Sequence, residues 1–415
     1  MRASFITFGC RLNQAESALM SSRLQKMGIQ VVPYSREFPP ELLFINSCAV
    51  TSVAERKVRQ CLHSLQKKHA GVKLFLTGCA SHMELPDIPG ITVFSNKGKR
   101  ELESVLRGEF SPPELSFEPV FYENIFTAAT ERTRANLKIQ EGCNNFCSYC
   151  IIPYKRGRER SRDLNETLKD FRQLVANGFQ EITLTGINTC SYDCHGAKLN
   201  DLLERLLETD GNYRIRIGST EPGPMLKKIV DIMAVSNGKL CEFLHPSLQN
   251  GSDTILKKMN RHCLTQEYAE YVQYAREKVP HIHIGTDIIT GFPGETDQTF
   301  QETVSFLEKI RFSNIHIFPF SPREGTAAYT MKPVVPGNVA QQRAEELARL
   351  KEICAEEFRR SLIGTVQTVI PERNGIGWSG NYVRVKVPGT GLVRARITGM
   401  EDDLLIGNIQ QRKEI

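Results

Sequence analysis

The chain has 415 residues, of which 40% are hydrophobic and 24% are charged, and its formal net charge is +6. This length and composition predict two or three domains with large cores and exclude a low-complexity chain. The start of the chain lacks the basic and apolar pattern of a signal peptide, and no apolar run approaches the roughly 18 residues of a membrane helix. We therefore expect a soluble cytoplasmic protein, in which the twelve cysteines stay reduced and serve metal or redox chemistry.

Residues 1–107 alternate short apolar runs with helical patterns. Strands are expected at Ser4–Phe8, Leu42–Ile45 and Lys73–Thr77, and helices at Gln14–Met27 and Ser52–Lys68. This alternation is typical of a parallel sheet with crossover helices, so the sequence predicts an N-terminal α/β domain.

Each predicted strand of this domain is followed by a cysteine. We call Cys10, Cys48 and Cys79 the strand-end cysteines. Because the carboxyl ends of parallel strands share one edge of a sheet, we expect the three thiols to converge and form one site. A lone buried cysteine is more often a small hydrophobic residue, but three at equivalent strand ends favour a shared cluster.

After a predicted linker at 108–130, a strand-helix rhythm recurs through residues 131–338. Strands are expected at Asn136–Gln140, Glu181–Thr185, Tyr213–Gly218, Leu240–Leu244, His281–Ile289 and Asn314–Phe318. Helices are expected at Leu164–Asn177, Asn200–Thr209, Pro224–Ser236, Gln266–Lys278 and Thr299–Arg311. These units predict an open or partial (β/α)6 barrel with its active site at the carboxyl ends of the strands.

A compact group of cysteines follows the first barrel strand. Cys143, Cys147 and Cys150 form a CxxxCxxC loop, and we call them the loop cysteines. Three thiolates leave one iron of a [4Fe-4S] cluster open to an external ligand, and this spacing resembles the signature of the radical S-adenosylmethionine enzymes. A zinc site is the main alternative, but no other Cys or His lies within the flanking 30 residues on either side.

The loop cysteines lie in a basic stretch. Between Arg132 and Arg162, eight Lys or Arg residues outnumber two acids, an excess equal to that of the whole chain. This charge indicates a polyanion or an anionic cofactor nearby, and a solvated basic turn is the alternative.

The tail of the chain changes character after a predicted helix at 339–362. Residues 363–415 hold short β-branched or alternating runs separated by Gly, Asn and Pro, at Val366–Ile370, Tyr382–Val387, Leu392–Ile397 and Leu404–Ile406. They predict a small β-barrel of a kind that often binds RNA. The candidate RNA contacts are Arg384, Lys386, Arg394 and Arg396, with Tyr382 and Trp378 as stacking partners; an ordinary charged surface is the alternative.

Longer segments resemble the methylthiotransferase family over nearly the whole chain. They are Thr7–Gln14, Ile45–Thr51, Ala54–Lys57, Leu76–Ala80 and Lys138–Arg162. The resemblance implies an N-terminal cluster domain, a radical S-adenosylmethionine barrel and a C-terminal RNA-binding TRAM domain. The segment Ile45–Thr51, followed by Arg56 and Lys57, most resembles the branch that acts on N6-threonylcarbamoyladenosine beside the tRNA anticodon. Arg11 departs from the family pattern, because other side chains are common after the first strand-end cysteine.

The resemblance also implies a division of labour. The loop cysteines would hold the cluster that cleaves S-adenosylmethionine to a radical, which abstracts hydrogen from C2 of adenine. The strand-end cysteines would hold an auxiliary [4Fe-4S] cluster that supplies sulfur, and a second S-adenosylmethionine would donate the methyl group. We expect a tRNA anticodon stem-loop as partner, an electron donor such as flavodoxin or ferredoxin, a monomeric state and no membrane.

Other positions resemble the cofactor-binding segments of the family less sharply. The candidates are Tyr149, Gly186, Asn188, Ser219, Glu221, Gln249 and Arg323. For each of them a turn-forming or packing role is the alternative. We expect core, packing or loop roles, and no third metal site, for the remaining cysteines and nearby histidines: Cys61, Cys190, Cys194, His195, Cys241, His245, His262, Cys263 and Cys354.

Two other interpretations of the function remain open. A methylthiotransferase could act on N6-isopentenyladenosine in tRNA or on a ribosomal-protein aspartate. A protein of another class, a non-catalytic iron-sulfur RNA-binding protein, would carry the same cysteines but would not cleave S-adenosylmethionine.

Overall fold

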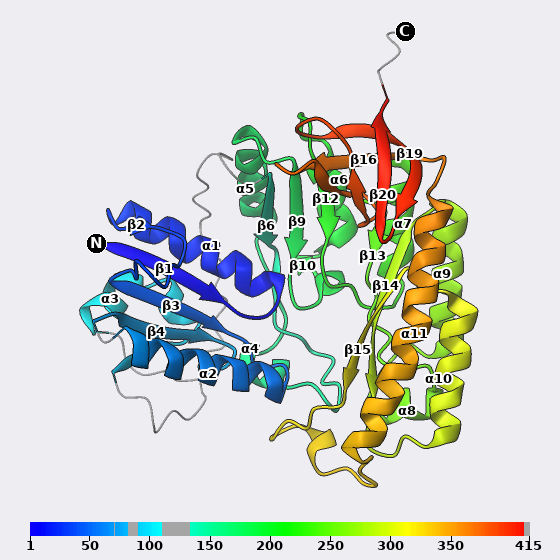
Figure 1. The fold of residues 1–415 in the computed structure, drawn as a ribbon, viewed down its shortest axis with the longest axis horizontal. Helices are drawn as coiled ribbons and strands as arrows, with labels where there is room; N and C mark the ends of the chain where they lie inside the picture. The colour runs from blue at the N-terminus through cyan, green and yellow to red at the C-terminus, as the bar shows by residue number, and fades with distance from the viewer. Residues whose placement is uncertain (70, 82–89, 110–132, 411–415) are drawn as a thin grey trace.

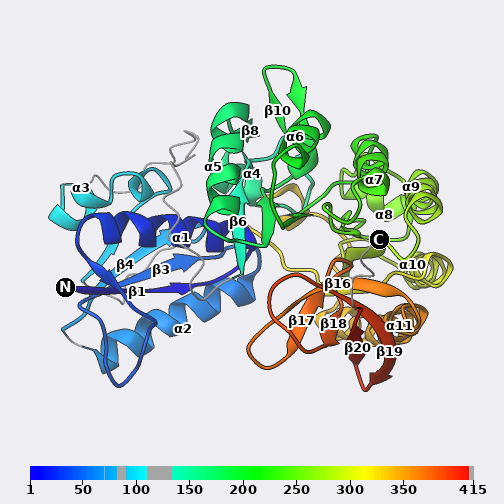
Figure 2. The same ribbon diagram turned by 90° about the horizontal axis from the view of Figure 1, so that it is seen from above.

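Three domains make up the computed structural model, which describes residues 1–69, 71–81, 90–109 and 133–410. The N-terminal sheet, the central barrel and the C-terminal barrel follow one another from blue to red (Figures 1 and 2). Except for its first two residues, the predicted linker at 108–130 lies outside the described residues. Gly108, the first of these two, ends the preceding helix in a left-handed conformation with φ +75°.

The N-terminal sheet is parallel throughout, with strand order β2-β1-β3-β4-β5. Its strands are β1 (Arg2–Thr7), β2 (Gln30–Val31), β3 (Leu42–Ser47), β4 (Lys73–Gly78) and β5 (Ile91–Val93), and its helices are α1 (Arg11–Lys26), α2 (Ser52–Lys68), η1 (Lys97–Lys99) and α3 (Leu102–Arg107). Leu42 and Phe44 pack with α1 and α3, whereas Leu43 and Ile45 pack with α2. Helices on both faces explain why β3 is apolar at successive positions. The predicted α/β domain is confirmed; the short edge strands β2 and β5 carry too little pattern to be predicted.

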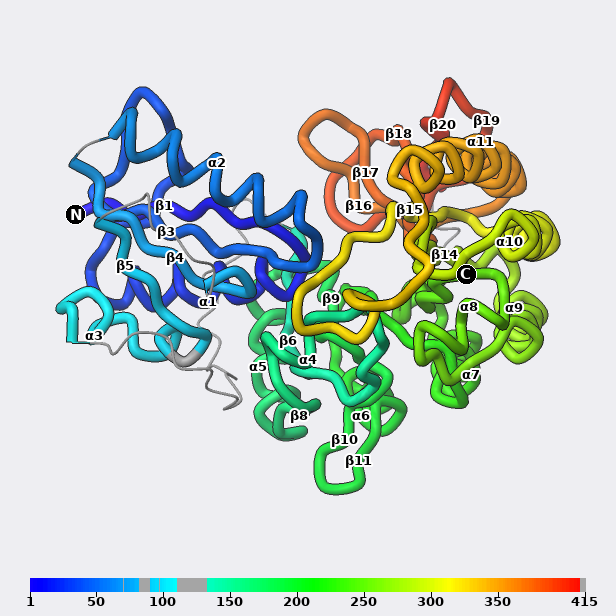
Figure 3. Tube along the Cα trace, turned by 90° about the horizontal axis from the view of Figure 1, so that it is seen from below, coloured from blue at the N-terminus to red at the C-terminus, as the bar shows by residue number. Residues whose placement is uncertain are grey.

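The central domain is an open parallel barrel. Two groups of strands, β6-β9-β12 and β13-β14-β15, meet through a parallel bridge between Ile215 and Leu240. The strands are β6 (Arg134–Lys138), β9 (Glu181–Thr185), β12 (Arg214–Ile217), β13 (Phe243–Leu244), β14 (His283–Thr290) and β15 (Asn314–Pro319). The helices are α4 (Ile152–Arg156), α5 (Leu164–Ala176), α6 (Leu199–Leu207), α7 (Met225–Val235), α8 (Asp253–Lys258), α9 (Thr265–Lys278) and α10 (Asp297–Ile310), with turns η2 (Thr189–Ser191) and η3 (Ala327–Tyr329) and a hairpin of β10 (Asp193–Cys194) and β11 (Ala197–Lys198). Figure 3 shows helices α5 to α10 outside the strands. The predicted partial barrel is confirmed.

The first barrel strand ends two residues earlier than predicted, at Lys138 rather than Gln140. The reason is a second small ladder, in which β7 (Gln140–Glu141) pairs antiparallel with β8 (Arg160–Ser161). The loop cysteines and α4 lie between these two strands, so the cysteine loop is closed at its base by main-chain hydrogen bonds.

The C-terminal domain is a closed five-stranded barrel that follows the long helix α11 (Gly337–Ser361). Its strands, in the spatial order β16-β17-β18-β20-β19, are β16 (Val366–Pro371), β17 (Ile376–Ser379), β18 (Arg384–Lys386), β19 (Val393–Glu401) and β20 (Leu404–Ile409). This architecture confirms the predicted TRAM-like barrel. The sequence did not predict β17, because its stretch contains Gly and Trp rather than an alternating pattern.

A buried ion cluster fixes the C-terminal barrel to the central one. Glu181 at the start of β9 pairs with Arg214 at 2.6 Å and Arg216 at 2.9 Å, and both arginines are fully buried. The same guanidinium groups donate to main-chain oxygens of the C-terminal barrel, from Arg214 to Thr368 at 2.7 Å and from Arg216 to Ser379 at 3.0 Å. The hydrogen bonds that dock the C-terminal barrel come from Arg214 and Arg216, and the carboxylate of Glu181 holds both arginines in place. Within the described residues, no helix is both long enough and apolar enough to cross a membrane.

Replacing Arg216 with Ala is expected to lower the free energy of unfolding by about 3–5 kcal/mol, because Glu181 would keep a buried charge with one partner fewer. Denaturant unfolding of the wild type and the variant measures this difference. The control is Arg384→Ala, which removes an arginine from the exposed face of β18 and should change stability by less than about 0.5 kcal/mol.

Acid provides an independent check of the same cluster. Burial tends to raise the pKa of Glu181, but the charges of Arg216 and Arg214 outweigh it and hold the pKa well below its ordinary value. Such a carboxylate stabilises the fold above its unfolded pKa of about 4.3, and this stability is lost as the pH falls toward the depressed folded pKa. The stability difference between wild type and Glu181→Gln should therefore shrink below about pH 4; a difference independent of pH would contradict the assignment.

Candidate active site

The loop cysteines are held by a strained turn at the base of their hairpin. Gly142 has φ +73°, and a Cβ at this position would lie 2.0 Å from the main-chain oxygen of Arg158. Cys143 donates its N–H to the oxygen of Gly157 at 3.2 Å, and its Sγ accepts from the N–H of Asn145 at 3.4 Å. Only glycine allows the two sides of the hairpin to approach this closely next to Cys143.

The far side of the loop rests on the end of α8. Ser148 donates its N–H to Met259 O at 2.9 Å and its hydroxyl to Lys258 O at 2.8 Å. Asn260 donates its side-chain amide to the main-chain oxygen of Asn145 at 3.1 Å. The loop is therefore fixed at both ends to the barrel, so its three thiols form a defined group.

Two thiols of the loop have raised pKa values. Burial, with a smaller contribution from the neighbouring thiol of Cys147, raises the pKa of Cys150 to about 12 and that of Cys143 to about 11. A bound cation stabilises buried thiols of this kind as thiolates.

The strand-end cysteines converge at the carboxyl edge of the N-terminal sheet, as the topology predicts. Gly9, with φ +94°, lets Cys48 approach so closely that a Cβ on the glycine would lie 2.8 Å from the Cβ of Cys48. Cys79 donates its N–H to Ser47 O at 3.0 Å. Burial, with smaller contributions from the thiols of Cys79 and Cys10, raises the pKa of Cys48 to about 11. The three thiols thus belong to one electrostatic group.

The two cysteine groups face each other across one small apolar cluster. Its members come from the strand ends of the N-terminal domain and from the hairpin of the barrel: Ala49, Cys79, Ala80 and Ile152, with Cys150 and Ile187 packed against them. A strand-end cysteine and a loop cysteine therefore contact the same cluster. The two cysteine groups therefore meet at the boundary between the N-terminal domain and the central barrel.

The spacing of the thiols suits clusters better than single ions. Among the described residues, only one trio of Cys, His, Asp or Glu brings its ligand atoms within 4.8 Å of one another, and it contains no cysteine. The thiolates of a single tetrahedral zinc lie about 3.8 Å apart, since each Zn–S bond is about 2.3 Å. Neither cysteine trio of the described residues meets this spacing, whereas in a [4Fe-4S] cluster each thiolate binds a different iron and the thiolates need not lie so close.

Five charged residues, which we call the buried charge cluster, join the domains beside the strand-end cysteines. They are Glu16 and Lys99 of the N-terminal domain and Lys138, Glu141 and Arg156 of the central barrel. Arg156 Nη1 lies 2.7 Å from Glu16 Oε1 and 2.8 Å from Glu141 Oε1, and Lys138 Nζ lies 2.7 Å from Glu141 Oε2. In the sequence, Lys138, Glu141 and Arg156 are only members of the charged stretch between Arg132 and Arg162, because sequence alone does not reveal that their charges are buried and paired.

Gly186 and Asn188 lie beside the hairpin of the loop cysteines. The side-chain oxygen of Gln140 accepts from the N–H groups of Ile187 and Asn188, both at 2.9 Å, while its amide donates to Gly142 O at 2.8 Å. A Cβ at Gly186 would lie 2.8 Å from that oxygen. The segment after β9 is therefore held against the cysteine loop, as a cofactor-binding segment requires.

Glu221 and Ser219 follow β12 on the same edge of the barrel. Arg261 pairs with Glu221 at 2.6 Å and donates to Cys147 Sγ at 3.6 Å. Burial raises the pKa of Glu221 above its ordinary value, although Arg261 opposes this. Ser219 accepts from the N–H of Thr189 at 3.1 Å through its main-chain oxygen, and the predicted contact of Ser219 with the cofactor stays a prediction.

Tyr149 and Gln249 lie at the same end of the barrel. Tyr149 packs against the apolar cluster that contains Phe292, in the glycine-rich segment after β14. Gln249 adopts φ +82° and donates its N–H to Asp287 O at 2.8 Å, extending the sheet beside β14. A left-handed conformation is unusual for glutamine. Here it turns the chain that follows β13 back toward β14.

Arg323 lies at the boundary between two domains. Its guanidinium pairs with Glu55 of α2, and the nearby Ser321 hydroxyl accepts from the N–H of Ser52 at 3.0 Å. The loop after β15 therefore docks on the start of α2. The predicted contact of Arg323 with the cofactor stays a prediction, and the structure adds a role in joining the domains.

All four predicted RNA contacts are exposed on the outside of the C-terminal barrel, on β18 (Arg384, Lys386) and β19 (Arg394, Arg396), which flank β20. Trp378 and Tyr382 stack on each other with ring centroids 4.5 Å apart. The Tyr382 hydroxyl accepts from Arg11 of the N-terminal domain at 3.2 Å. The stacking of these two rings with RNA stays a prediction.

The sequence pattern did not reveal a group of four polar side chains inside the barrel. Asp287 on β14 accepts from His245 Nε2 at 3.0 Å, from His316 Nδ1 at 3.2 Å and from Ser247 Oγ at 2.6 Å. His245 was expected to have only a packing or loop role. His316 is 50% exposed and Phe318, two residues further along β15, is 42% exposed, so this inner face is open to a ligand.

The remaining cysteines have the packing roles expected for them. Cys241, Cys263 and Cys354 are buried, while Cys190 and Cys194 pack against the main core of the barrel. Cys194, in the β10–β11 hairpin, has its Sγ 4.0 Å from Asp163 Oδ2.

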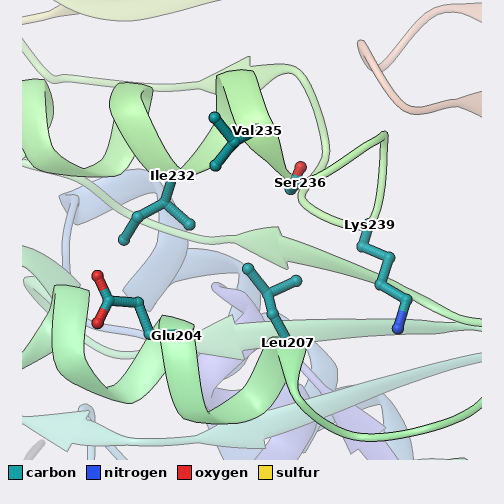
Figure 4. A pocket seen from close by; sticks show the side chains of 6 residues that line it. All are labelled: Glu204, Leu207, Ile232, Val235, Ser236 and Lys239. Carbon is teal, nitrogen blue, oxygen red and sulfur yellow. The ribbon is translucent and has the colours of Figure 1, made fainter.

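A surface pocket lies elsewhere, between α6, α7 and the turn that follows α7 (Figure 4). It is lined by Glu204, Leu207, Ile232, Val235, Ser236 and Lys239. None of these residues is a cysteine or a predicted cofactor contact, so the pocket is separate from the candidate active site.

Two family models match the chain. The radical SAM superfamily matches residues 137–307, and the uncharacterized protein family UPF0004 matches residues 2–91. A threonylcarbamoyladenosine tRNA methylthiotransferase MtaB from Bacillus subtilis is 34% identical over 93% of this chain and 90% of its own length. A tRNA-2-methylthio-N(6)-dimethylallyladenosine synthase from Carboxydothermus hydrogenoformans is 34% identical over 88% of this chain and 87% of its own length.

The chain belongs to the radical S-adenosylmethionine methylthiotransferase family. It is an enzyme, a transferase whose cofactors are [4Fe-4S] clusters and S-adenosylmethionine. A radical S-adenosylmethionine methyltransferase, TsrM from Kitasatospora setae, has a similar fold, with TM-score 0.57, 15% identity, and 79% of this chain and 77% of that chain covered.

Replacing Gly142 with Ala should disrupt the cysteine loop, because the new Cβ meets Arg158 O at 2.0 Å in a backbone conformation that disfavours side chains. We expect anaerobically reconstituted Gly142→Ala to retain about half of the wild-type iron, since the strand-end site is untouched. Iron analysis and visible absorption measure this. Gly223→Ala is the control, because a Cβ there meets nothing within 4 Å; full iron in Gly142→Ala would contradict the role of the turn.

Proposed function

We propose that this enzyme adds a methylthio group to C2 of N6-threonylcarbamoyladenosine next to the anticodon of tRNA. The observation that carries the proposal is the contact of the two cysteine groups across one apolar cluster, through Cys79 and Cys150. A reaction that first activates a carbon and then transfers sulfur to it needs both centres within reach of one substrate atom. The identity to methylthiotransferases over most of the chain supports the same reaction.

Each cysteine group has its own part in this proposal. The loop cysteines hold the cluster that binds S-adenosylmethionine, and the strand-end cysteines hold the auxiliary cluster. When bound, these groups supply the radical, the sulfur and the methyl group that adenine C2 requires, since that carbon is neither acidic nor electrophilic enough for acid-base chemistry.

The side chains around the cysteines orient and shield this site. Gln140 holds the segment of Gly186 and Asn188 beside the loop, where the methionine part of the cofactor is expected. Arg261 holds Glu221 close to Cys147, which suits a contact with the cofactor's amino group or ribose. The apolar cluster between the cysteine groups keeps water away from a reactive intermediate.

The inner face of β15 supports the choice of modified base. Relatives of similar identity carry names of both tRNA branches, so identity alone does not separate them. His316 and Asp287 present donors and acceptors beside the exposed ring of Phe318. A threonylcarbamoyl group has a carboxylate, a hydroxyl and a urea that can pair with such groups, whereas an isopentenyl group cannot replace their hydration.

The tRNA would approach from the C-terminal barrel. Its exposed arginines and lysine can neutralise phosphates without reading bases, as is typical of shape recognition of RNA. Action on N6-isopentenyladenosine or on a ribosomal-protein aspartate is the alternative, and a non-catalytic iron-sulfur protein is the alternative of another class.

Mass spectrometry of tRNA nucleosides from cells that lack this protein tests the substrate. We expect 2-methylthio-N6-threonylcarbamoyladenosine to disappear and its precursor without the methylthio group to accumulate. Expression of the wild-type chain should restore the modification and is the control. Loss of the isopentenyl nucleoside, with the threonylcarbamoyl one unchanged, would favour the alternative branch.

The two cysteine groups are separable in a second prediction. Cys48→Ala should still form 5′-deoxyadenosine from S-adenosylmethionine but yield no thiolated RNA, because only the strand-end site loses a ligand. Cys147→Ala should yield neither product. Cys354→Ala is the control, because this thiol lies on α11 outside both groups. Thiolation by Cys48→Ala, or absence of 5′-deoxyadenosine with the wild type under strict anaerobiosis, would contradict the proposal.

A further inference from the structure

One arginine of the helix that follows the loop cysteines contacts a strand-end cysteine. Arg156 is the last residue of α4, six positions after Cys150, and its side chain is fully buried. Its Nε donates to Cys79 Sγ at 3.2 Å, across the boundary between the barrel and the N-terminal domain. A residue of the cysteine hairpin therefore contacts a thiol of the other cysteine group.

All five N–H donors of this guanidinium have acceptors. Besides the bond from Nε to Cys79, Nη1 donates to Glu16 at 2.7 Å and to Glu141 at 2.8 Å. Nη2 donates to Asn13 at 2.6 Å and to Glu16 at 3.2 Å. A planar group with five fixed donors can satisfy these acceptors in one orientation only, so its bond to the thiol is fixed in direction.

The acceptors themselves belong to the N-terminal cysteine site. Asn13 donates its side-chain amide to Phe8 O and to Ser47 O, both at 2.8 Å, and these oxygens belong to the segments that carry Cys10 and Cys48. Arg156 thus contacts one strand-end cysteine directly and the segments of the other two through Asn13. Simple packing would not require a charged group at this point.

We propose that Arg156 is a positioning residue that fixes the strand-end cysteine site against the loop cysteines and raises the reduction potential of the cluster held there. The inference rests on the proposed function for the role of that cluster. A cation that donates to a ligand sulfur stabilises the more negative, reduced state of the cluster, and groups that orient metal ligands set both potential and retention.

The variants separate charge from geometry. Arg156→Gln removes the positive charge and the planar group with five donors. It should lower the reduction potential of the strand-end cluster. Arg156→Lys keeps the charge but cannot donate to Cys79, Glu16 and Asn13 together, so it should give an intermediate potential. Lys155→Gln is the matched control, because it removes a positive charge one residue away on the same helix.

Potentials are measured by anaerobic redox titration with electron paramagnetic resonance, in a background with all three loop cysteines changed to Ala so that one cluster remains. Iron retention against a chelator should fall about tenfold or more in Arg156→Gln and stay at the wild-type level in Lys155→Gln. An unchanged potential and unchanged retention in Arg156→Lys and Arg156→Gln would overturn the inference.

A readout without any cluster makes the test independent of the reaction. In the metal-free protein, hydrogen–deuterium exchange of the segments that carry the strand-end cysteines, followed by mass spectrometry, should be faster in Arg156→Lys than in wild type, because Asn13 and Glu16 lose donors and these segments loosen. The segment around Cys354 on α11 is the internal control. If Arg156→Gln fails to fold, Arg156→Lys decides the question. Failure of the wild type to thiolate RNA would refute the proposed function, whereas wild-type exchange of these segments in Arg156→Lys would refute this inference.

Discussion

The charge balance around Glu16 is the constraint on which the arrangement of this enzyme depends. The Glu16 carboxylate is fully buried and pairs with Lys99 at 2.5 Å, Lys138 at 3.1 Å and Arg156 at 2.7 Å. Burial tends to raise the pKa of Glu16, but these cations outweigh it and hold the pKa well below its ordinary value. A buried ion cluster of this kind adds little net stability compared with apolar residues, yet it penalises any arrangement that leaves one member unpaired. It therefore acts mainly on specificity, by allowing the two domains one relative position.

That position brings two sheet edges together. In both α/β domains the functional residues follow the carboxyl ends of parallel strands, where loops are free to carry them. The cluster of Ala49, Cys79, Ala80 and Ile152 exists because the edge of the N-terminal sheet faces the hairpin after the first barrel strand. Two metal sites that each need a sheet edge can then share one substrate only if the sheets face each other, and the pairing of Glu16 with Arg156 fixes this orientation.

The sequence predicted the features that depend on residue spacing and on the period of the hydrophobic pattern. It did not predict the features that depend on contacts between domains. Cys10, Cys48 and Cys79 were grouped correctly because strand topology dictates where the ends of parallel strands lie. Arg156 could not be separated from its basic neighbours, since its burial and its bond to Cys79 arise only when the domains meet. Asp287 was missed for a similar reason: His245 and His316 reach it from neighbouring strands far apart in the chain.

The position of Arg11 extends the same reasoning to the third domain. It follows Cys10 directly, and it donates to the hydroxyl of Tyr382 in the C-terminal barrel at 3.2 Å. The ring of Tyr382 lies in turn 5.0 Å from the guanidinium of Arg216, which pairs with Glu181. One tyrosine therefore contacts the N-terminal domain and the central barrel, within one residue of a strand-end cysteine.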